Sequence, residues 1–283
     1  MSKRRSYLYI PAIKEKYYEK IDSYNADAII FDLEDSVKYE NKEEARELLQ
    51  KFFNKDTLTS KEIFVRINSE PNHNEQDMKL INKYFKKIKG VFLPKVNRSE
   101  EIDIADKAMG EGSVQIIPLI ETPEAVLNLE EISMNEKVTT VALGEVDLSR
   151  SLNINPSNGF KQLIPIRLFV NLVLAANKKE APIGPVWTNI DDEKGLKDHM
   201  EMIRNLGYSG VQLIHPNQIE ITNEIFSHSE DEVTWARSIL ELGNELESNS
   251  GSFKDSNNEM IDEAVIKRAR MIIESIEEDL DKS

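Results

Sequence analysis

The sequence predicts a (β/α)8 TIM barrel followed by a C-terminal helical extension. Eight short apolar runs recur before residue 215, and amphipathic or charged stretches separate them. A chain of 283 residues is long enough for a barrel, which takes about 250 residues, and a tail. Repeated alternation of strands and helices is typical of a parallel sheet, and eight repeats favour a closed barrel.

The eight apolar runs are the expected strands. They are short, rich in β-branched residues and continuous rather than alternating, as expected for strands that are covered on both faces. The runs are Tyr7–Ile10, Ala28–Phe31, Ile63–Ile67, Gly90–Leu93, Val114–Ile120, Thr139–Leu143, Ala181–Trp187 and Gly210–Ile214.

The stretches between the runs predict helices. Lys42–Phe53 has apolar residues at helical spacing, with Asn41 as its expected cap. Pro123 suits the first turn of a helix. Gly159–Asn177 predicts the longest helix, and acidic residues at the start of Asp191–Leu206 favour a helix start there.

The pattern changes after residue 228. We therefore expect a catalytic barrel over residues 1–228 and a helical extension over residues 229–283. Glu230–Glu247 and Met260–Asp279 predict two helices, and the polar stretch Ser248–Asn258 between them predicts a mobile loop. Because the barrel is complete without it, the extension is expected to cap the barrel or to pack on a neighbouring subunit.

Composition excludes several classes of function. The formal net charge of −15 disfavours nucleic acid and anionic membranes as partners, because both are bound mainly through Lys and Arg. The absence of cysteine excludes disulfides, thiolate metal sites and a cysteine nucleophile. No apolar run reaches the length of a signal peptide or a membrane span, so the expected localisation is cytoplasmic.

Polar and charged residues follow at least six of the expected strands. In (β/α)8 enzymes the chemistry lies at the carboxyl ends of the strands. Loops also face water, which explains a single polar strand end but explains six together less well. The candidates are Asp32, Glu34, Asp35, Arg66, Asn68, Lys95, Glu121, Thr122, Glu145, Asp147, Thr188 and His215.

Glu121 and Asp147 are the candidate metal ligands. They follow adjacent strands, which lie about 4.8 Å apart in a sheet, so both carboxylates can reach one ion. Ligand sets made only of oxygen suit Mg²⁺, with Mn²⁺ as the alternative. The other interpretation is that these are solvated carboxylates, or that they form ion pairs with Lys95 and Arg66.

Arg66 is a charge within an apolar run, so it needs a partner. A guanidinium can hold a substrate carboxylate through two hydrogen bonds, and the alternative is a structural salt bridge to Glu34 or Asp35. Lys95 could form a Schiff base, but the nearby carboxylates favour a metal.

The four histidines have weaker signals. His215 could act as an acid or a base, but its place in a turn that begins a helix favours a structural role or a role in supporting a neighbouring site residue. His73, His199 and His228 lie in charged stretches and are expected at the surface.

Seven motifs together resemble a known family. RSYLYIPA, ADAIIFDLEDSV, FVRIN, FLPKV, PLIETPEAV, LGEVDLSRSL and GVQLIHPNQI occur in the order seen in the citrate lyase β-subunit-like family of the HpcH/HpaI aldolase group. The resemblance extends from about residue 4 to residue 275. It implies a (β/α)8 enzyme that uses Mg²⁺ to cleave or form hydroxyacyl-CoA thioesters, and a homotrimer or dimer of trimers.

The resemblance also implies roles for individual residues. Glu121 and Asp147 match its metal ligands, Arg66 matches its carboxylate-binding arginine, and Glu34 with Asp35 matches its acidic pair. Asp262 matches an aspartate that some members supply to a neighbouring active site. Arg5 and Lys14 are the expected contacts to coenzyme A, and Lys95 and Thr122 are expected to contact the substrate.

The chain departs from the family pattern near the expected coenzyme A contacts. Ala12 replaces a usual glycine, a basic or proline-containing stretch reads Ile13–Lys16, and Glu259 replaces another frequent glycine. These changes leave the expected metal site intact. They leave open how coenzyme A would bind, and therefore which acyl carrier the chain uses.

The expected function is therefore a carbon–carbon lyase. It would convert a citryl-, malyl- or citramalyl-CoA thioester into a 2-keto acid and acetyl-CoA or a relative, or run in reverse. Arg66 would orient the substrate carboxylate, and Asp35 or Asp262 would exchange a proton with the enolate carbon. The alternatives are a subunit of a citrate lyase complex that acts on a carrier-bound citryl group, and a non-catalytic keto-acid-binding protein.

Overall fold

The computed structural model describes residues 4–55, 59–110, 114–155, 160–246, 253–254 and 260–280. The chain divides into two compact units, of which Arg4–Phe226 is one and Ser227–Ser283 form most of the other. None of the helices in the described ranges has the length and apolarity that a membrane crossing requires.

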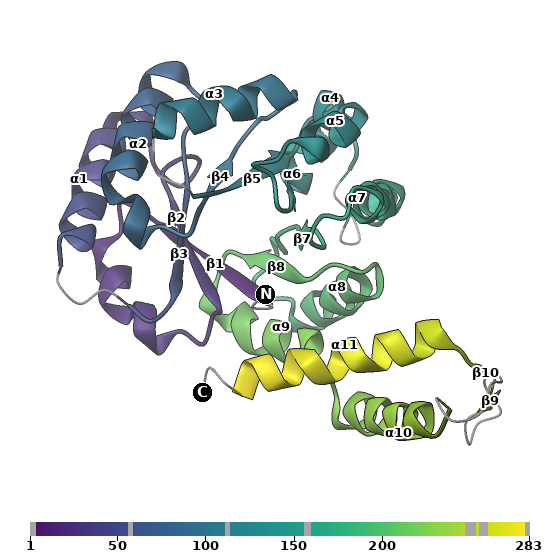
Figure 1. Ribbon diagram of the computed structural model, residues 1–283. Helices are drawn as coiled ribbons and strands as arrows, with labels where there is room; N and C mark the ends of the chain where they lie inside the picture. The colour runs from purple at the N-terminus through teal and green to yellow at the C-terminus, as the bar shows by residue number, and fades with distance from the viewer. Residues whose placement is uncertain are drawn as a thin grey trace. The chain divides into compact units, whose positions relative to one another are not determined.

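The first unit is a closed barrel of eight parallel strands surrounded by helices (Figure 1). The strands pair in chain order and β8 pairs with β1, so the sheet has no free edge. The (β/α)8 prediction is confirmed. The strands are β1 (Ser6–Pro11), β2 (Ala28–Asp32), β3 (Glu62–Arg66), β4 (Gly90–Leu93), β5 (Gln115–Ile120), β6 (Ala142–Leu143), β7 (Ile183–Gly184) and β8 (Gly210–Leu213).

Strand β7 is much shorter than the predicted run of seven residues. Pro182 and Pro185 flank it, and proline has no backbone N–H to donate to a neighbouring strand. Strand β6 is also short, and it begins three residues later than the run predicted.

The strands are apolar throughout because the barrel buries both of their faces. Ala28 and Ile30 belong to the cluster that fills the barrel, whereas Ile29 and Phe31 pack into the outer core beneath the helices. Inside the barrel, Tyr7, Phe64 and Phe92 meet edge to face with ring centroids 5.7 to 6.0 Å apart. Continuous hydrophobic runs are the expected signature of such strands.

Helices follow the strands around the outside of the barrel. The α-helices are α1 (Lys42–Phe53), α2 (Pro71–Tyr84), α3 (Ser99–Met109), α4 (Pro123–Leu127), α5 (Leu129–Met134), α6 (Glu145–Ser151), α7 (Ile164–Ala176), α8 (Glu193–Asn205) and α9 (Ile219–Phe226). The 3-10 turns are η1 (Glu15–Ser23), η2 (Tyr39–Asn41), η3 (Phe85–Lys87), η4 (Lys161–Leu163) and η5 (Pro216–Gln218).

Two helix predictions were wrong in detail. Helix α1 has the predicted bounds, but Asn41 makes no side-chain cap, because η2 runs directly into the helix. Helix α7 begins at Ile164 and is shorter than α2. Phe160 has a left-handed backbone with φ 53° and a 3-10 turn follows it, which delays the helix start. Gly159, the predicted start, lies outside the described residues.

The second unit is a pair of helices. Helices α10 (Glu230–Leu246) and α11 (Glu263–Leu280) pack together around Ala236, Ile239 and Ala269. The short strands β9 (Phe253–Lys254) and β10 (Met260–Ile261) pair antiparallel.

The second predicted helix of the extension, Met260–Asp279, starts later than expected, at Glu263. Met260 and Ile261 are extended, and the helix starts after Asp262, whose Oδ1 accepts the N–H of Val265 at 2.9 Å. Most of the predicted loop Ser248–Asn258 lies outside the described residues. Packing of this unit on a neighbouring subunit stays a prediction.

A buried ion pair fixes helix α6, which begins directly after β6. Nε and Nη2 of Arg167 donate to the two carboxylate oxygens of Glu145 at 2.5 and 2.6 Å, and both side chains are almost fully buried. Glu145 lies in the first turn of α6 and Arg167 lies on α7. The pair therefore sets the position of α6 against the neighbouring helix.

We expect Arg167→Met to lower the free energy of unfolding by about 3–5 kcal/mol, because it leaves the Glu145 carboxylate buried without its partner. Urea unfolding at pH 7 measures the change. The double variant Glu145→Leu, Arg167→Leu is the control, and it should recover most of the loss. Equal destabilisation of the single and double variants would contradict this account.

Candidate functional site

A cavity of about 590 Å³ opens at the carboxyl ends of the barrel strands. Its wall contains four of the residues to which the sequence analysis assigned a catalytic or metal-binding role, namely Asp35, Arg66, Glu121 and Asp147. They come from β2, β3, β5 and β6 or from the segments that follow these strands. The barrel thus brings together side chains that are up to 112 residues apart in the chain.

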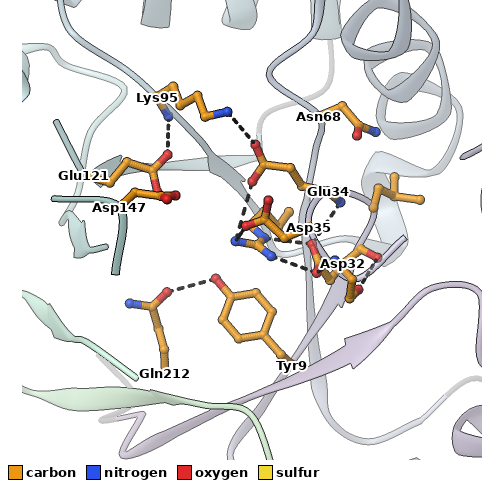
Figure 2. Close-up of polar contacts among 12 residues, drawn as sticks. Tyr9, Asp32, Glu34, Asp35, Asn68, Lys95, Glu121, Asp147 and Gln212 are labelled. Atoms are coloured by element: carbon orange, nitrogen blue, oxygen red, sulfur yellow. Dashed lines mark hydrogen bonds and ion pairs between the residues drawn. The ribbon is translucent and has the colours of Figure 1, made fainter. Parts of the chain in front are cut away.

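The two predicted metal ligands lie side by side at this cavity (Figure 2). Glu121 follows β5 directly and is 4% exposed, and Asp147 lies in the first turn of α6. Burial raises the pKa of Glu121 to about 7, and the charge of Asp147 adds to the shift. Two carboxylates that repel each other, one of them almost fully buried, form a site suited to a cation.

Backbone contacts hold Glu121 in place. Its Oε1 accepts the N–H of Lys95 at 2.7 Å, and Lys95 has a left-handed backbone with φ 54°. A Cβ added to Gly144 would lie 2.6 Å from the Cβ of Glu121. Only glycine therefore lets β6 leave the barrel this close to the carboxylate.

Asp147 has a cationic partner that the sequence analysis did not assign. Nη1 of Arg150, one turn further along α6, donates to its Oδ1 at 2.6 Å. Arg150 is 76% exposed and also lines the cavity, so its side chain is able to move when another cation approaches Asp147.

Arg66 is held by Asp32, a partner that differs from those the sequence suggested. Its Nε and Nη2 donate to the two oxygens of Asp32 at 2.7 and 2.8 Å. The predicted partners are further away, since Nη1 lies 3.2 Å from Asp35 and 3.5 Å from Glu34. The guanidinium carbon lies 4.9 Å from the ring centroid of Tyr9, so the ring supports the guanidinium from one side.

Glu34 and Asp35 differ in environment although they are neighbours in sequence. Asp35 has a side chain that is 65% exposed, whereas that of Glu34 is 9% exposed. Burial raises the pKa of Glu34 to about 7, opposed by Arg66 and assisted by other carboxylates. Its Oε1 has no hydrogen-bond partner, and Nζ of Lys95 lies 4.0 Å away (Figure 2). Glu34 is therefore suited to hold a proton near neutral pH.

Tyr9 and Gln212 form a polar contact within the cavity that the sequence analysis missed. The Tyr9 hydroxyl donates to Oε1 of Gln212 at 2.9 Å (Figure 2). Nε2 of Gln212 donates to the carbonyls of Leu143 and Gly184, each at 3.1 Å, and so ties β8 to the short strands β6 and β7. A glutamine within the apolar run of β8 was the available signal.

Other predicted contacts have different surroundings. The Thr122 hydroxyl caps α4 by accepting the N–H of Ala125 at 3.0 Å, and it also bonds Asn97. Lys14 is exposed in the segment after β1. Roles for Thr122 and Lys14 in binding stay predictions.

Arg5 does not line the cavity, and the predicted role of Asp262 in a neighbouring active site stays a prediction. Arg5 precedes β1 and donates to both oxygens of Asp27, which precedes β2, at 2.9 and 2.8 Å. It therefore lies at the opposite end of the barrel from the cavity, and we withdraw it as a coenzyme A contact. Asp262 belongs to the second unit, where it caps α11.

The histidine predictions were partly correct. His215 caps η5 by accepting the N–H of Asn217 at 3.3 Å, which confirms its structural role. The surface prediction for His199 was wrong, because it is 2% exposed and packs on Trp187. Burial lowers its pKa to about 3, so the ring is neutral at physiological pH. His73 and His228 are half-buried.

The family model of the HpcH/HpaI aldolase/citrate lyase family matches residues 5–216 of this chain. The chain belongs to this family. The matched residues span the barrel almost completely, and they include every residue of the cavity described above.

Curated relatives extend the similarity beyond the barrel. The citrate lyase subunit beta of Haemophilus influenzae is 27% identical, and the alignment covers 97% of each chain. A (3S)-malyl-CoA thioesterase of Cereibacter sphaeroides is 28% identical, with 96% of this chain and 94% of the relative covered.

A solved structure shows the same fold. The CitE protein of Mycobacterium tuberculosis, in a complex with magnesium, acetoacetate and coenzyme A, superposes with a TM-score of 0.79 at 23% identity. The superposition covers 96% of this chain and 97% of that one. Family membership makes the chain an enzyme of the aldolase and lyase class, as the sequence predicted.

We expect Asp32→Asn to destabilise the protein by about 3 kcal/mol at pH 7, at the lower end of the range for a broken buried pair, because Arg66 keeps Glu34 and Asp35. Burial would raise the pKa of Asp32, but Arg66 and hydrogen bonds hold it below its ordinary value. Its contribution is therefore present above about pH 4 and is lost as the pH falls. Urea unfolding at pH 7 and at about pH 2.5, well below the ordinary pKa of an aspartate, should show that the difference between wild type and variant shrinks in acid; a constant difference would contradict it.

Proposed function

We propose that this chain is a Mg²⁺-dependent carbon–carbon lyase that cleaves or forms a hydroxyacyl thioester. The observation that carries the proposal is the convergence of Glu121 and Asp147 on one cavity, beside Arg66, in a member of an aldolase and citrate lyase family. The products of cleavage would be a 2-keto acid and acetyl-CoA or a relative.

The donor set fits magnesium. Mg²⁺ binds oxygen, keeps several waters and takes one or two carboxylates from a protein. Glu121 and Asp147 supply two carboxylates, and no cluster of three His, Asp or Glu ligands occurs in the part of the chain that the structure describes. A metal that needs three protein side chains fits less well. The magnesium in the structure of the Mycobacterium tuberculosis CitE complex supports the same assignment.

The residues of the site then have separate tasks. When bound, Mg²⁺ would polarise the substrate oxygens at the carbon that becomes a carbonyl. Asp32 occupies Nε and Nη2 of Arg66, so a substrate carboxylate would be oriented through Nη1, in exchange for its contact with Asp35 at 3.2 Å. Arg150, which pairs with Asp147, supplies a second cation to the cavity wall.

Proton exchange at the enolate carbon needs a carboxyl group close to the cavity. Asp35 lies in the cavity wall and Glu34 is buried beside it with a pKa of about 7, close to the optimum for a group that gains and loses a proton at neutral pH. Asp262 of a neighbouring subunit is the alternative donor. It would have to give up its cap on α11 or serve both purposes.

Two relatives favour different acyl carriers. The similarity to a malyl-CoA thioesterase supports a free coenzyme A thioester, whereas the similarity to citrate lyase subunits supports a carrier-bound citryl group within a complex. The purified chain with Mg²⁺ and citryl-, malyl- or citramalyl-CoA, with the released keto acid measured, separates them. Turnover of a free thioester supports the first, and turnover only with a citrate lyase carrier protein supports the second.

A keto-acid-binding protein without activity is the third candidate. It is tested in the same assay, since such a protein would bind oxaloacetate or pyruvate with Mg²⁺ but would turn over no thioester. The oligomeric state expected from the resemblance, a homotrimer or a dimer of trimers, also remains a proposal.

We expect Glu121→Gln to reduce Mg²⁺-dependent turnover by about 100-fold or more, because the loss of a direct ligand should exceed the 10–100-fold effect of removing a supporting residue. Turnover of the best thioester at saturating Mg²⁺ is the measurement. Glu124→Gln, an exposed carboxylate on α4, is the matched control and should leave turnover unchanged. Unchanged turnover in Glu121→Gln would refute the metal site.

We also expect Mg²⁺ to bind more weakly as the pH falls below about 7. The raised pKa of Glu121 means that a proton competes with the ion, so affinity should fall by up to about tenfold per pH unit below that value. Calorimetric titration with Mg²⁺ between pH 5.5 and pH 8.5 tests this. An affinity that is constant over this range would show that Glu121 does not titrate with the ion.

A further inference from the structure

Gln212 on β8 is a buried polar residue among the side chains that fill the barrel. It is 3% exposed and lies opposite Tyr7 in the register of β1 and β8. Its Nε2 donates to the carbonyls of Leu143 and Gly184, each at 3.1 Å. Because carbonyls can only accept, the amide has one possible orientation, with Nε2 toward them and Oε1 toward Tyr9.

This orientation fixes the hydrogen of the Tyr9 hydroxyl. Oε1 of Gln212 carries no hydrogen, so the 2.9 Å contact between the two side chains requires that Tyr9 donates (Figure 2). Burial raises the pKa of Tyr9, and the charges of Asp32 and Glu121 raise it further against the effect of Arg66. The hydroxyl therefore keeps its proton at neutral pH, and its oxygen can only accept further hydrogen bonds.

The Tyr9 oxygen is available to a molecule in the cavity. Tyr9 and Gln212 both line the cavity, and no N–H or O–H group among the described residues donates to the Tyr9 oxygen. A hydroxyl group of a ligand can satisfy such an oxygen. A ketone or carboxylate oxygen in the same place would put two acceptors face to face, which leaves both without a hydrogen bond.

Tyr9 lies close to both charged parts of the site. The guanidinium carbon of Arg66, the expected carboxylate-binding residue, is 4.9 Å from the centroid of the Tyr9 ring. The charge of Glu121, an expected metal ligand, is near enough to shift the pKa of Tyr9. In a 2-hydroxy acid the hydroxyl is on the carbon next to the carboxylate. A carboxylate at Arg66 therefore brings that hydroxyl toward the Tyr9 oxygen.

We propose that Tyr9 is a specificity-determining residue that accepts a hydrogen bond from the hydroxyl of a 2-hydroxyacyl substrate, and that Gln212 enforces this role by holding the Tyr9 hydrogen. The inference rests on the proposed function for the class of substrate. The hydrogen bond is lost when the hydroxyl becomes a carbonyl. The pair therefore holds the substrate of cleavage and not the 2-keto acid that is released.

Paired titrations with malate and oxaloacetate test the inference, because these acids differ in having a hydroxyl or a carbonyl at the same carbon. Calorimetry of the full chain at saturating Mg²⁺ gives both dissociation constants. We expect Tyr9→Phe, which keeps the ring beside Arg66, to weaken malate binding about five-fold, the usual effect of one lost hydrogen bond. Oxaloacetate binding should stay unchanged or become tighter.

Tyr84→Phe is the matched control. The Tyr84 hydroxyl also donates to an amide oxygen at 2.9 Å, that of Asn54, but Tyr84 does not line the cavity. This variant should leave the binding of both acids unchanged. Circular dichroism checks that each variant is folded.

Gln212→Met tests the orienting role of the amide. Without Oε1, the Tyr9 hydrogen can turn toward the ligand and donate to a ketone, so oxaloacetate should bind about five-fold tighter than in the wild type. Adding Tyr9→Phe to Gln212→Met should remove that gain. The same Tyr9 substitution would thus weaken oxaloacetate binding in this background and not in the wild type, whereas a purely structural contact would affect both acids alike.

The outcomes separate this inference from the lyase proposal. If Tyr9→Phe changes the binding of both acids equally, or of neither, or if the wild type binds neither acid, the inference is overturned. If Gln212→Met does not fold, Tyr9→Phe alone decides. A chain that cleaves no thioester but shows the expected difference between malate and oxaloacetate refutes the lyase proposal and supports the role of Tyr9.

Discussion

The carboxylate of Asp32 is the interaction on which the geometry of the cavity depends. It accepts two hydrogen bonds from Arg66 and further bonds from the N–H groups of Glu34 and Ser36, at 2.7 to 3.0 Å. One buried group therefore fixes both the arginine at the end of β3 and the turn after β2 that carries the acidic pair. Without it, the Arg66 charge would have only one exposed carboxylate and one buried carboxylate within reach. Asp32 therefore connects Arg66 with the turn that carries Glu34 and Asp35.

The cavity gathers more negative than positive charge. Five carboxylates lie in or beside it, those of Asp32, Glu34, Asp35, Glu121 and Asp147. The nearby cations are Arg66, Lys95 and Arg150, and Arg66 is already paired with Asp32. Burial raises the pKa of Glu34 and of Glu121 to about 7, and the neighbouring carboxylates add to both shifts, whereas Arg66 and hydrogen bonds keep Asp32 ionised. A divalent cation beside Glu121 and Asp147 would remove most of the repulsion. This electrostatic argument supports a metal independently of the family.

The sequence was sufficient to predict the barrel and the polar ends of its strands, because continuous apolar runs and their spacing depend on local order. It was not sufficient for side-chain partners. The pairing of Arg66 with Asp32 depends on the register of β2 against β3, which places these two residues opposite each other. The burial of His199 depends on Trp187 and the packing of α8, whereas the two residues before it, Lys197 and Asp198, are charged. The position of Arg5 at the far end of the barrel follows from its place before a strand, which a motif match alone does not take into account.

The hydrogen bonds of Asp32 also give different surroundings to three acidic residues that look equivalent in the sequence. Asp32, Glu34 and Asp35 lie within four residues, yet one is paired with an arginine, one is buried without a full partner, and one is exposed. An ionised group suits positioning, a group with a pKa near 7 suits proton exchange, and an exposed group at the cavity wall can meet solvent and substrate alike. If a cation at Glu121 reduced the negative potential, the pKa of Glu34 would fall as well, because Glu121 contributes to its shift. Binding of the ion and the protonation of Glu34 are therefore coupled, and the acid–base behaviour of the site depends on whether the metal is bound.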